Sequence, residues 1–134
     1  MANKLKKTKL LLNPPRILTE YEIGRSMGAI EAIELLDKPI AEVMTRRAKL
    51  RDLEADLEDC IKLSGTRGIK YYVRRASDGR YEYGFYRYPW VLAGLDFLQR
   101  TKLSDLDRSW ISGRLFGYTP REIQRFIDRD VKKR

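Results

Sequence analysis

The residues best suited to contact an anionic polymer follow a helix start close to the C-terminal end of the chain. Arg121, Gln124 and Arg125 have the spacing of neighbours on one helix face, just after Thr119. A guanidinium can donate two hydrogen bonds to a guanine edge, and a carboxamide can pair in the same way with adenine. Further cations nearby suit phosphate contacts, which add affinity without selecting a sequence. They are Arg114, Arg129, Lys132 and Lys133.

Enzymatic chemistry is poorly supported by the composition. The 134 residues contain no histidine and a single cysteine, Cys60. The usual general base, the Ser-His and Cys-His nucleophile pairs and the commonest metal ligand are therefore missing, and a zinc site would need more cysteines. No glycine-rich phosphate loop is present. We expect a protein that is not an enzyme and uses no cofactor.

The charge balance points to anionic partners. The chain has 28 Lys and Arg against 19 Asp and Glu, a net charge of +9. Nucleic acid is the first expectation, and an acidic protein or a nucleoprotein the second. A lone cysteine and no apolar run of membrane-spanning length favour a cytoplasmic protein. Residues 1–16 read as a basic arm, which either tracks phosphates or only aids solubility; its lysines are Lys4, Lys6, Lys7 and Lys9.

Two helices are expected ahead of a hairpin. The capping-box pattern Thr19-Glu20-Tyr21-Glu22 and apolar residues at helical spacing predict a helix over about Glu20–Asp37. Gly24 and Gly28 on it favour close approach of another helix. After Pro39, a longer helix is predicted over about Ile40–Leu63, ended by Gly65. Its apolar stripe indicates either an antiparallel pair with the first helix or a homodimer seam.

Alternating residues from Ile69 to Val73 and from Tyr81 to Phe85, joined through Asp78-Gly79, predict a β-hairpin. Tyr72 and Arg74, together with Arg87, are candidate contacts, because exposed tyrosines beside cations can stack on bases while the cations hold phosphate. The alternative is that the tyrosines only form strands and pack one face on helices.

The last third is expected to hold three short helices, over Pro89–Arg100, after Ser104, and after Thr119-Pro120-Arg121-Glu122. The predicted fold class is α+β and mostly helical: two N-terminal helices, one β-hairpin and a C-terminal trihelical unit. The predicted parts are the arm (1–16), the helical pair with the hairpin (17–88) and the trihelical unit (89–134), together one compact domain.

The stretch Trp110–Ile127 resembles a helix-turn-helix. Gly113 supplies a small residue where the helices cross, Gly117 tolerates the turn, and Ile123 and Phe126 stand where the second helix buries apolar side chains. Ser112 departs from the pattern, which usually has an apolar residue there. The resemblance implies that the second helix enters the major groove, with its outward residues toward the bases. These are Thr119, Arg121, Gln124 and Arg125.

A second set of residues is similar to the omega-type small subunit of cellular RNA polymerases. Leu18-Thr19-Glu20-Tyr21-Glu22, Pro39 and the segment from Val73 to Glu82 come in that family's order and near its spacing. The family's arginine-rich helix pattern is missing between Ala29 and Leu36. This resemblance implies a protein that docks on a polymerase.

Two functions follow as predictions. The first is non-enzymatic nucleic-acid binding through the C-terminal helix-turn-helix, as a small regulator, with DNA favoured over RNA. The second is a protein-interaction module, a subunit or an inhibitor, that docks on a nucleic-acid-processing machine such as RNA polymerase or a nucleoprotein effector. No membrane partner is expected, and a homodimer is compatible with both.

Overall fold

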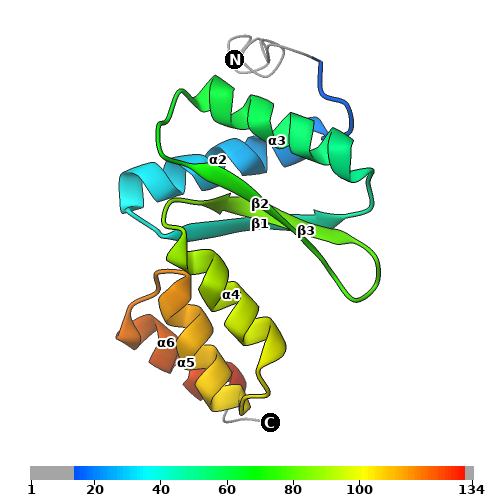
Figure 1. The fold of residues 1–134 in the computed structure, drawn as a ribbon. Coiled ribbons are helices and arrows are strands. Elements are labelled where there is room, and N and C mark those ends of the chain that lie inside the picture. Colours follow the sequence, from blue (N-terminus) through cyan, green and yellow to red (C-terminus); the bar gives the residue numbers. More distant parts are fainter. Residues whose placement is uncertain (1–13, 132–134) are drawn as a thin grey trace.

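The computed structural model describes residues 14–131, which form five α-helices, a π-helical turn and a three-stranded antiparallel sheet (Figure 1). The elements follow in the order α2 (Glu20–Leu36), β1 (Ile40–Arg46), α3 (Leu50–Ser64), β2 (Lys70–Arg75), β3 (Tyr81–Tyr86), α4 (Trp90–Arg100), α5 (Asp105–Leu115), α6 (Pro120–Phe126) and η1 (Ile127–Val131). The predicted α+β class is therefore confirmed. None of the described helices is long and apolar enough to cross a bilayer.

Helix α2 begins and ends as the sequence predicts. The Thr19 hydroxyl accepts from the Glu22 backbone N–H at 3.1 Å, and the Glu22 carboxylate accepts from the Thr19 N–H at 3.3 Å, which completes the capping box. The helix buries Ile23, Ile30 and Ile33 in the core. It ends at Asp37, whose backbone is left-handed with φ 51°.

The predicted helix over Ile40–Leu63 is wrong in its first half. Ile40–Arg46 is a strand, β1, which pairs with β3, and the helix α3 starts only at Leu50. The pairing register shifts between Glu42 and Met44, as at a β-bulge, so strict alternation of buried and exposed residues is lost. The buried residues Ile40 and Val43 consequently stand three apart, a spacing that also suits a helix.

The predicted hairpin is confirmed, and β1 makes it part of a sheet with the order β1-β3-β2. Strands β2 and β3 pair with Tyr71 opposite Phe85 and Val73 opposite Tyr83. The turn between them closes with a hydrogen bond from the Gly79 N–H to the Ala76 carbonyl, with Gly79 at φ 82°. The third strand could not come from the hairpin signal, because β1 lies about forty residues before its partner.

Helices cover both faces of the sheet (Figure 1). Helices α2 and α3 lie on one face, where Tyr83 and Phe85 of β3 meet Leu53 and Leu57 of α3 in the larger core. The other face belongs to a second, smaller core that joins the sheet to the C-terminal helices. Its buried residues are Ile40, Tyr72, Tyr86, Val91, Leu98 and Leu115.

Polar groups also fix the larger core. The Asp56 carboxylate on α3 accepts the backbone N–H groups of Arg16, Ile17 and Leu18 at 2.8, 2.8 and 2.9 Å, which holds the chain that leads into α2. The buried Glu22 carboxylate accepts from the Arg46 guanidinium at 2.7 Å and from the Tyr83 hydroxyl at 2.9 Å. These bonds tie α2 to β1 and β3.

Two expectations about helix packing are wrong. A β-carbon at Gly24 or Gly28 would meet nothing within 4 Å, so no helix of the described chain approaches them closely. The buried face of α2 lies on its other side, where Ile23 and Ile30 pack. The apolar stripe of α3 is not available as a homodimer seam, because Leu53, Leu57 and Cys60 are fully buried inside this chain's own core. Of its members on α3, only Leu50 is exposed, at 42%.

The three C-terminal helices begin where the sequence predicts. The hydroxyl of Ser104 caps α5, and the Thr119 hydroxyl with the Glu122 carboxylate forms the capping box of α6, with Pro120 at the first helical position. Helices α4 and α5 approach closely, since a β-carbon at Gly94 would lie 2.7 Å from Leu115. The C-terminal helices thus form a unit that sits below the sheet in Figure 1.

Candidate nucleic-acid interface

Two glycines shape the connection between α5 and α6, as the sequence predicts. A β-carbon at Gly113 would lie 2.6 Å from the Ile123 Cγ1 atom, so only glycine lets α6 pack this closely. Gly117 has φ 83°, a left-handed backbone that favours glycine, and a β-carbon here would lie 3.1 Å from Cδ of Pro39, just before β1. The turn is therefore fixed both to its own helices and to the sheet.

The burial predicted for Phe126 is wrong. Ile123 and Ile127, four residues apart, are the buried side chains of the C-terminal helix, whereas Phe126 is 42% exposed. Successive residues on an α-helix are rotated by about 100° around its axis. Because Ile127 takes the buried position, the Phe126 side chain points to one side of the interface between α5 and α6. The chain continues from Ile127 as the π-helical turn η1.

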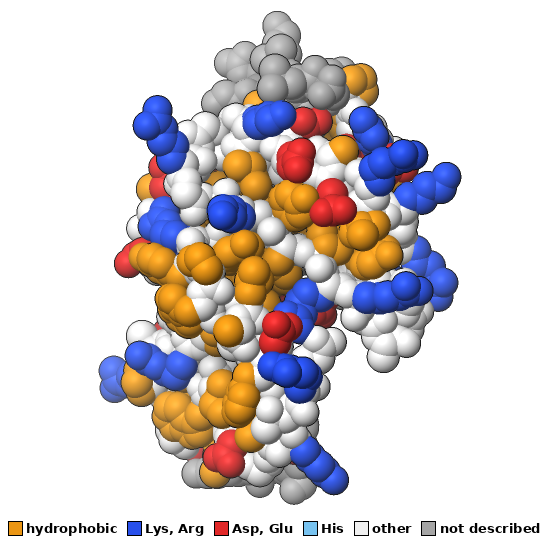
Figure 2. All heavy atoms as spheres, in the orientation of Figure 1, with side chains coloured by type: hydrophobic (Ala, Val, Ile, Leu, Met, Phe, Trp, Pro, Cys, Tyr) orange, Lys and Arg blue, Asp and Glu red, His pale blue; other side chains and the backbone are white. Residues whose placement is uncertain are grey.

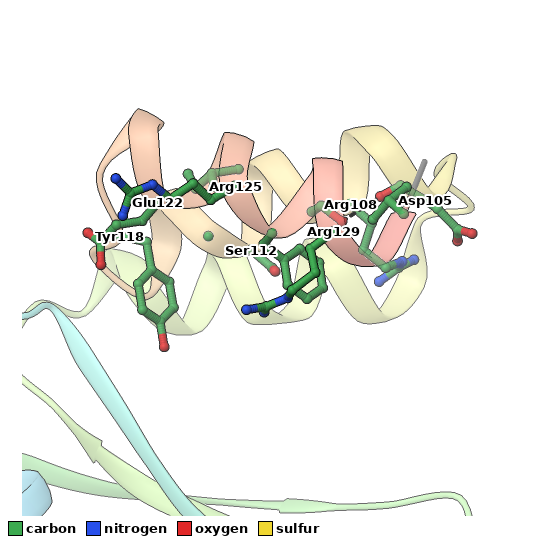
Figure 3. Close-up of a pocket in the computed structure, with 12 residues that line it drawn as sticks. Asp105, Arg108, Ser112, Tyr118, Glu122, Arg125 and Arg129 are labelled. Atoms are coloured by element: carbon green, nitrogen blue, oxygen red, sulfur yellow. Dashed lines mark hydrogen bonds between the residues drawn. The ribbon is translucent and has the colours of Figure 1, made fainter. Parts of the chain in front are cut away.

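A groove of about 670 Å³ runs between α5 and the segment formed by α6 and η1 (Figure 3). Tyr118 and Glu122 lie near one end of it, and Asp105 and Arg108 near the other. The start of α6 thus lies beside the end of α5, and η1 lies near the start of α5, so the two segments run antiparallel. The remaining lining residues are Ser109, Ser112, Gly113, Ile123, Arg125, Phe126, Arg129 and Val131.

Three exposed arginines stand at intervals of four residues along α6 and η1. This arginine row consists of Arg121, Arg125 and Arg129, all of them exposed. Arg129 pairs with Asp130 at 2.8 Å, whereas the ion pairs found among residues 14–131 include neither Arg121 nor Arg125. The row therefore presents at least two guanidinium groups to a partner.

Carboxylates stand between the arginines of the row in the sequence, and they have hydrogen-bond partners of their own. Asp128 accepts from the Gln124 amide at 2.9 Å, and Glu122 belongs to the capping box. The hydrogen bonds from the Thr119 backbone N–H and hydroxyl lower the pKa of Glu122, and the charges of Lys38 and Arg125 lower it further. Glu122 thus stays ionised in mildly acidic solution and continues to hold the start of the row.

The other predicted contact residues of the C-terminal unit lie near the row. Thr119 is exposed at the start of α6, where its hydroxyl is occupied by the cap. Gln124 is half-buried and donates to Asp128. Arg114 is exposed at the end of α5 and donates to the Tyr118 carbonyl at 3.2 Å. Lys132 and Lys133 lie outside the described residues.

The hairpin candidates are corrected by the structure. Tyr72 is only 6% exposed and belongs to the smaller core, so it cannot stack on a base. The Arg74 side chain, 13% exposed, pairs with Asp96 of α4 at 2.9 Å and also contacts Gln99. Arg87 pairs with Asp37 at 3.2 Å. Helix α4 covers the face of the hairpin that carries Tyr72 and Arg74, so these side chains stabilise the fold.

The positive charge is unevenly distributed along the sequence. Seven of the 28 cations, and none of the carboxylates, lie in residues 1–13 and 132–134. Residues 14–131 therefore carry 21 cations against 19 carboxylates. On the face shown in Figure 2, basic and acidic side chains are scattered around large apolar areas. Within the described part, the arginine row is a local feature on a nearly neutral body.

The sequence interpretation missed the groove itself. Ser112, which departs from the helix-turn-helix pattern, is one of its lining residues. A polar residue at a position that should be apolar was thus a signal that this side of α5 is open. Among residues 14–131, no group of three or more Cys, Asp or Glu side chains is arranged to hold a metal ion.

Comparison with protein-family models, with curated proteins and with solved structures finds no match to this chain. The resemblances to helix-turn-helix proteins and to the omega-type subunit therefore stay predictions. The function has to be argued from the surface of the molecule.

Proposed function

We propose that this protein binds nucleic acid through its C-terminal helical unit, with the arginine row of α6 and η1 as the contact surface. The observation that carries the proposal is the row itself: Arg121, Arg125 and Arg129 are all exposed, at intervals of four residues along α6 and η1. Guanidinium groups at this spacing suit phosphates and base edges, which arginine contacts through paired donors. The row leads directly into Lys132 and Lys133 in the sequence, which extends the charge.

The mode we favour is insertion of α6 into the major groove of DNA, as in helix-turn-helix proteins. The glycine pair Gly113 and Gly117 and the capping box of α6 support this mode, since they fix a short helix against its neighbour and leave the opposite side exposed. Arg121 and Arg125 would face the bases. Arg114 and Arg129 would meet phosphates, which sets the register on the duplex.

The proposal is tested by fluorescence anisotropy of labelled duplex DNA with the full chain over a range of salt concentrations. If cations contact phosphates, the logarithm of the binding constant falls linearly with the logarithm of salt concentration, by about 0.9 per phosphate. No binding at low salt would refute the proposal.

Base reading is tested by a separate variant. Changing Arg121, Gln124 and Arg125 together to Ala should abolish any preference between duplex sequences and leave thermal unfolding nearly unchanged, because these side chains are exposed or half-buried. A variant that keeps the sequence preference would exclude α6 as the reading helix.

The second candidate is a docking module on a nucleic-acid-processing machine, and one surface feature favours it. Tyr88 and Trp90 stack at the start of α4, with ring centroids 6.1 Å apart, and Trp90 is 56% exposed. Figure 2 shows apolar side chains gathered where the end of the sheet meets the C-terminal unit. Exposed aromatic residues are enriched at protein interfaces. Trp90→Ala should then weaken partner capture without changing DNA affinity.

A further inference from the structure

Phe126 is a bulky apolar side chain that the fold leaves in the open groove between α5 and α6. The flanking residues Ile123 and Ile127 take the buried positions, and the phenyl ring stays 42% exposed. A single exposed apolar side chain is common on protein surfaces and needs no explanation by itself. Phe126 differs from such a residue because a second aromatic ring and several arginines line the same groove.

A second aromatic ring and several cations share the groove with Phe126. Tyr118, 46% exposed, lies at the end where α6 begins, and Arg125 and Arg129 come from the same segment as Phe126. Arg108 lines the opposite wall, where its guanidinium donates to the Leu98 and Thr101 carbonyls at 2.7 and 2.9 Å. Exposed rings between cations are the combination with which proteins hold single-stranded nucleic acid: bases stack on the rings and cations hold the phosphates.

The carboxylates of the groove leave this combination intact. Glu122 is held by the capping box, and Asp105 lies at the far end of the groove, in the first turn of α5 (Figure 3). Arg129, three residues after Phe126 in the sequence, lines the groove together with it. The volume of about 670 Å³ falls within the roughly 300–1,000 Å³ typical of pockets that enclose organic ligands.

We propose that the groove takes an unpaired base, stacked on Phe126, while Arg129 holds the adjoining phosphate. The inference rests on the proposed function, because Arg129 belongs both to the arginine row and to the groove. A base inside a duplex is stacked on both sides and cannot reach the ring, whereas the base of a single-stranded end can. The ligand class is duplex DNA that continues into a single strand.

The test compares two DNA probes with each protein variant: a blunt duplex and the same duplex with a short single-stranded overhang. Binding is measured by fluorescence anisotropy as the ratio of the two dissociation constants. The wild-type protein should favour the overhang by roughly 5- to 150-fold, which corresponds to the stacking of one base. Phe126→Ala should lose most of this gain, and Phe126→Trp should retain it.

Phe97→Ala is the matched control, since Phe97 is 43% exposed on α4 and does not line the groove. It should keep the full gain. Extra phosphates on the overhang raise the affinity of every variant alike, so the loss confined to Phe126→Ala is diagnostic. In Phe126→Trp, the added indole fluorescence should be quenched by the overhang probe and not by the blunt duplex.

The outcomes separate this inference from the proposed function. If Phe126→Ala keeps the full gain, or if the wild-type protein shows none, the groove does not hold a base, while binding of the blunt duplex by the arginine row stands. If neither probe binds at low salt, the proposed function fails and the inference fails with it. Thermal unfolding of each variant should match that of the wild-type protein, because Phe126 and Phe97 are exposed.

Discussion

Gly113 and Ile123 pack so closely that a β-carbon on the glycine would lie 2.6 Å from Ile123 Cγ1 and 2.9 Å from Cδ1. Real β-carbons do not come this near to another side chain, so the absence of a side chain at position 113 sets the distance between α5 and α6. The width of the groove and the position of the arginine row both depend on this contact.

Gly113→Ala should therefore destabilise the protein. The added methyl group forces Ile123 or the whole of α6 to move, and overpacking of this kind costs about 1–3 kcal/mol. Urea unfolding followed by circular dichroism measures the loss.

Gly24→Ala is the control, because Gly24 lies in the interior of α2 and its β-carbon would meet nothing within 4 Å. Here alanine should raise the free energy of unfolding by about 0.5–1 kcal/mol, through its better helix propensity. Equal effects of the two substitutions would contradict the close packing of α5 on α6.

Asp56→Ala should lower the free energy of unfolding by about 2–4 kcal/mol. The substitution removes the acceptor of three backbone N–H groups, those of Arg16, Ile17 and Leu18, and leaves them unsatisfied next to the core. Asp56→Asn should lower the free energy of unfolding by less than Asp56→Ala does, because one side-chain oxygen remains as an acceptor. The control is Asp59→Ala on the same helix, which should change the free energy of unfolding by less than about 0.5 kcal/mol. A loss as large as that of Asp56→Ala would show that the charge of the helix matters and not the hydrogen bonds of Asp56 to the three backbone N–H groups.

Cys60 should be unreactive in the native protein. Burial raises the pKa of its thiol to about 12, and the charges of Asp56 and Asp59 add to the shift. At pH 8 the thiolate population is therefore very small, and a thiol reagent should react only after the protein unfolds in urea. The sign of the linkage also follows: stabilisation from the protonated thiol is present below the unfolded pKa and is lost as pH rises from about 9 toward 12. Rapid modification of the native thiol at pH 8 would show that Cys60 is accessible.

Arg74→Ala should lower stability and leave DNA affinity unchanged. The guanidinium joins β2 to Asp96 of α4, and its loss should cost about 1 kcal/mol, as for a partly exposed ion pair. Thermal unfolding and an anisotropy titration on the same sample check the two statements. A drop in affinity without loss of stability would restore the hairpin as a contact surface.

The elements that could be predicted from the sequence are those that local contacts define. Thr19 with Glu22 and Thr119 with Glu122 close capping boxes within four residues, so each helix start is encoded where it occurs. The Asp78-Gly79 turn is equally local. These boundaries needed no knowledge of the rest of the chain.

The strand β1 could not be predicted in this way. Its bulge at Glu42–Met44 gives buried residues a spacing of three, and its partner β3 lies far along the sequence. The choice between Phe126 and Ile127 as a buried residue likewise depends on which side of α5 is open. The exposure of Arg121 and Arg125 could be predicted because it follows from the helix period, whereas the groove depends on packing between two helices.

The central claim is that the arginine row binds nucleic acid, and a charge-matched pair of variants tests it most directly. In one, Arg121, Arg125 and Arg129 are changed to Ala; in the other, the exposed residues Arg51, Arg67 and Arg80 are changed to Ala. Both lose three positive charges, so a difference between them reports position and not net charge. Salt-dependent anisotropy titrations on duplex DNA should show the first variant losing affinity at every salt concentration. It should also lose about 1 from the slope of log binding constant against log salt concentration, for the phosphate contact of Arg129, whereas the second variant should keep both nearly unchanged. Equal losses in the two variants would contradict the claim.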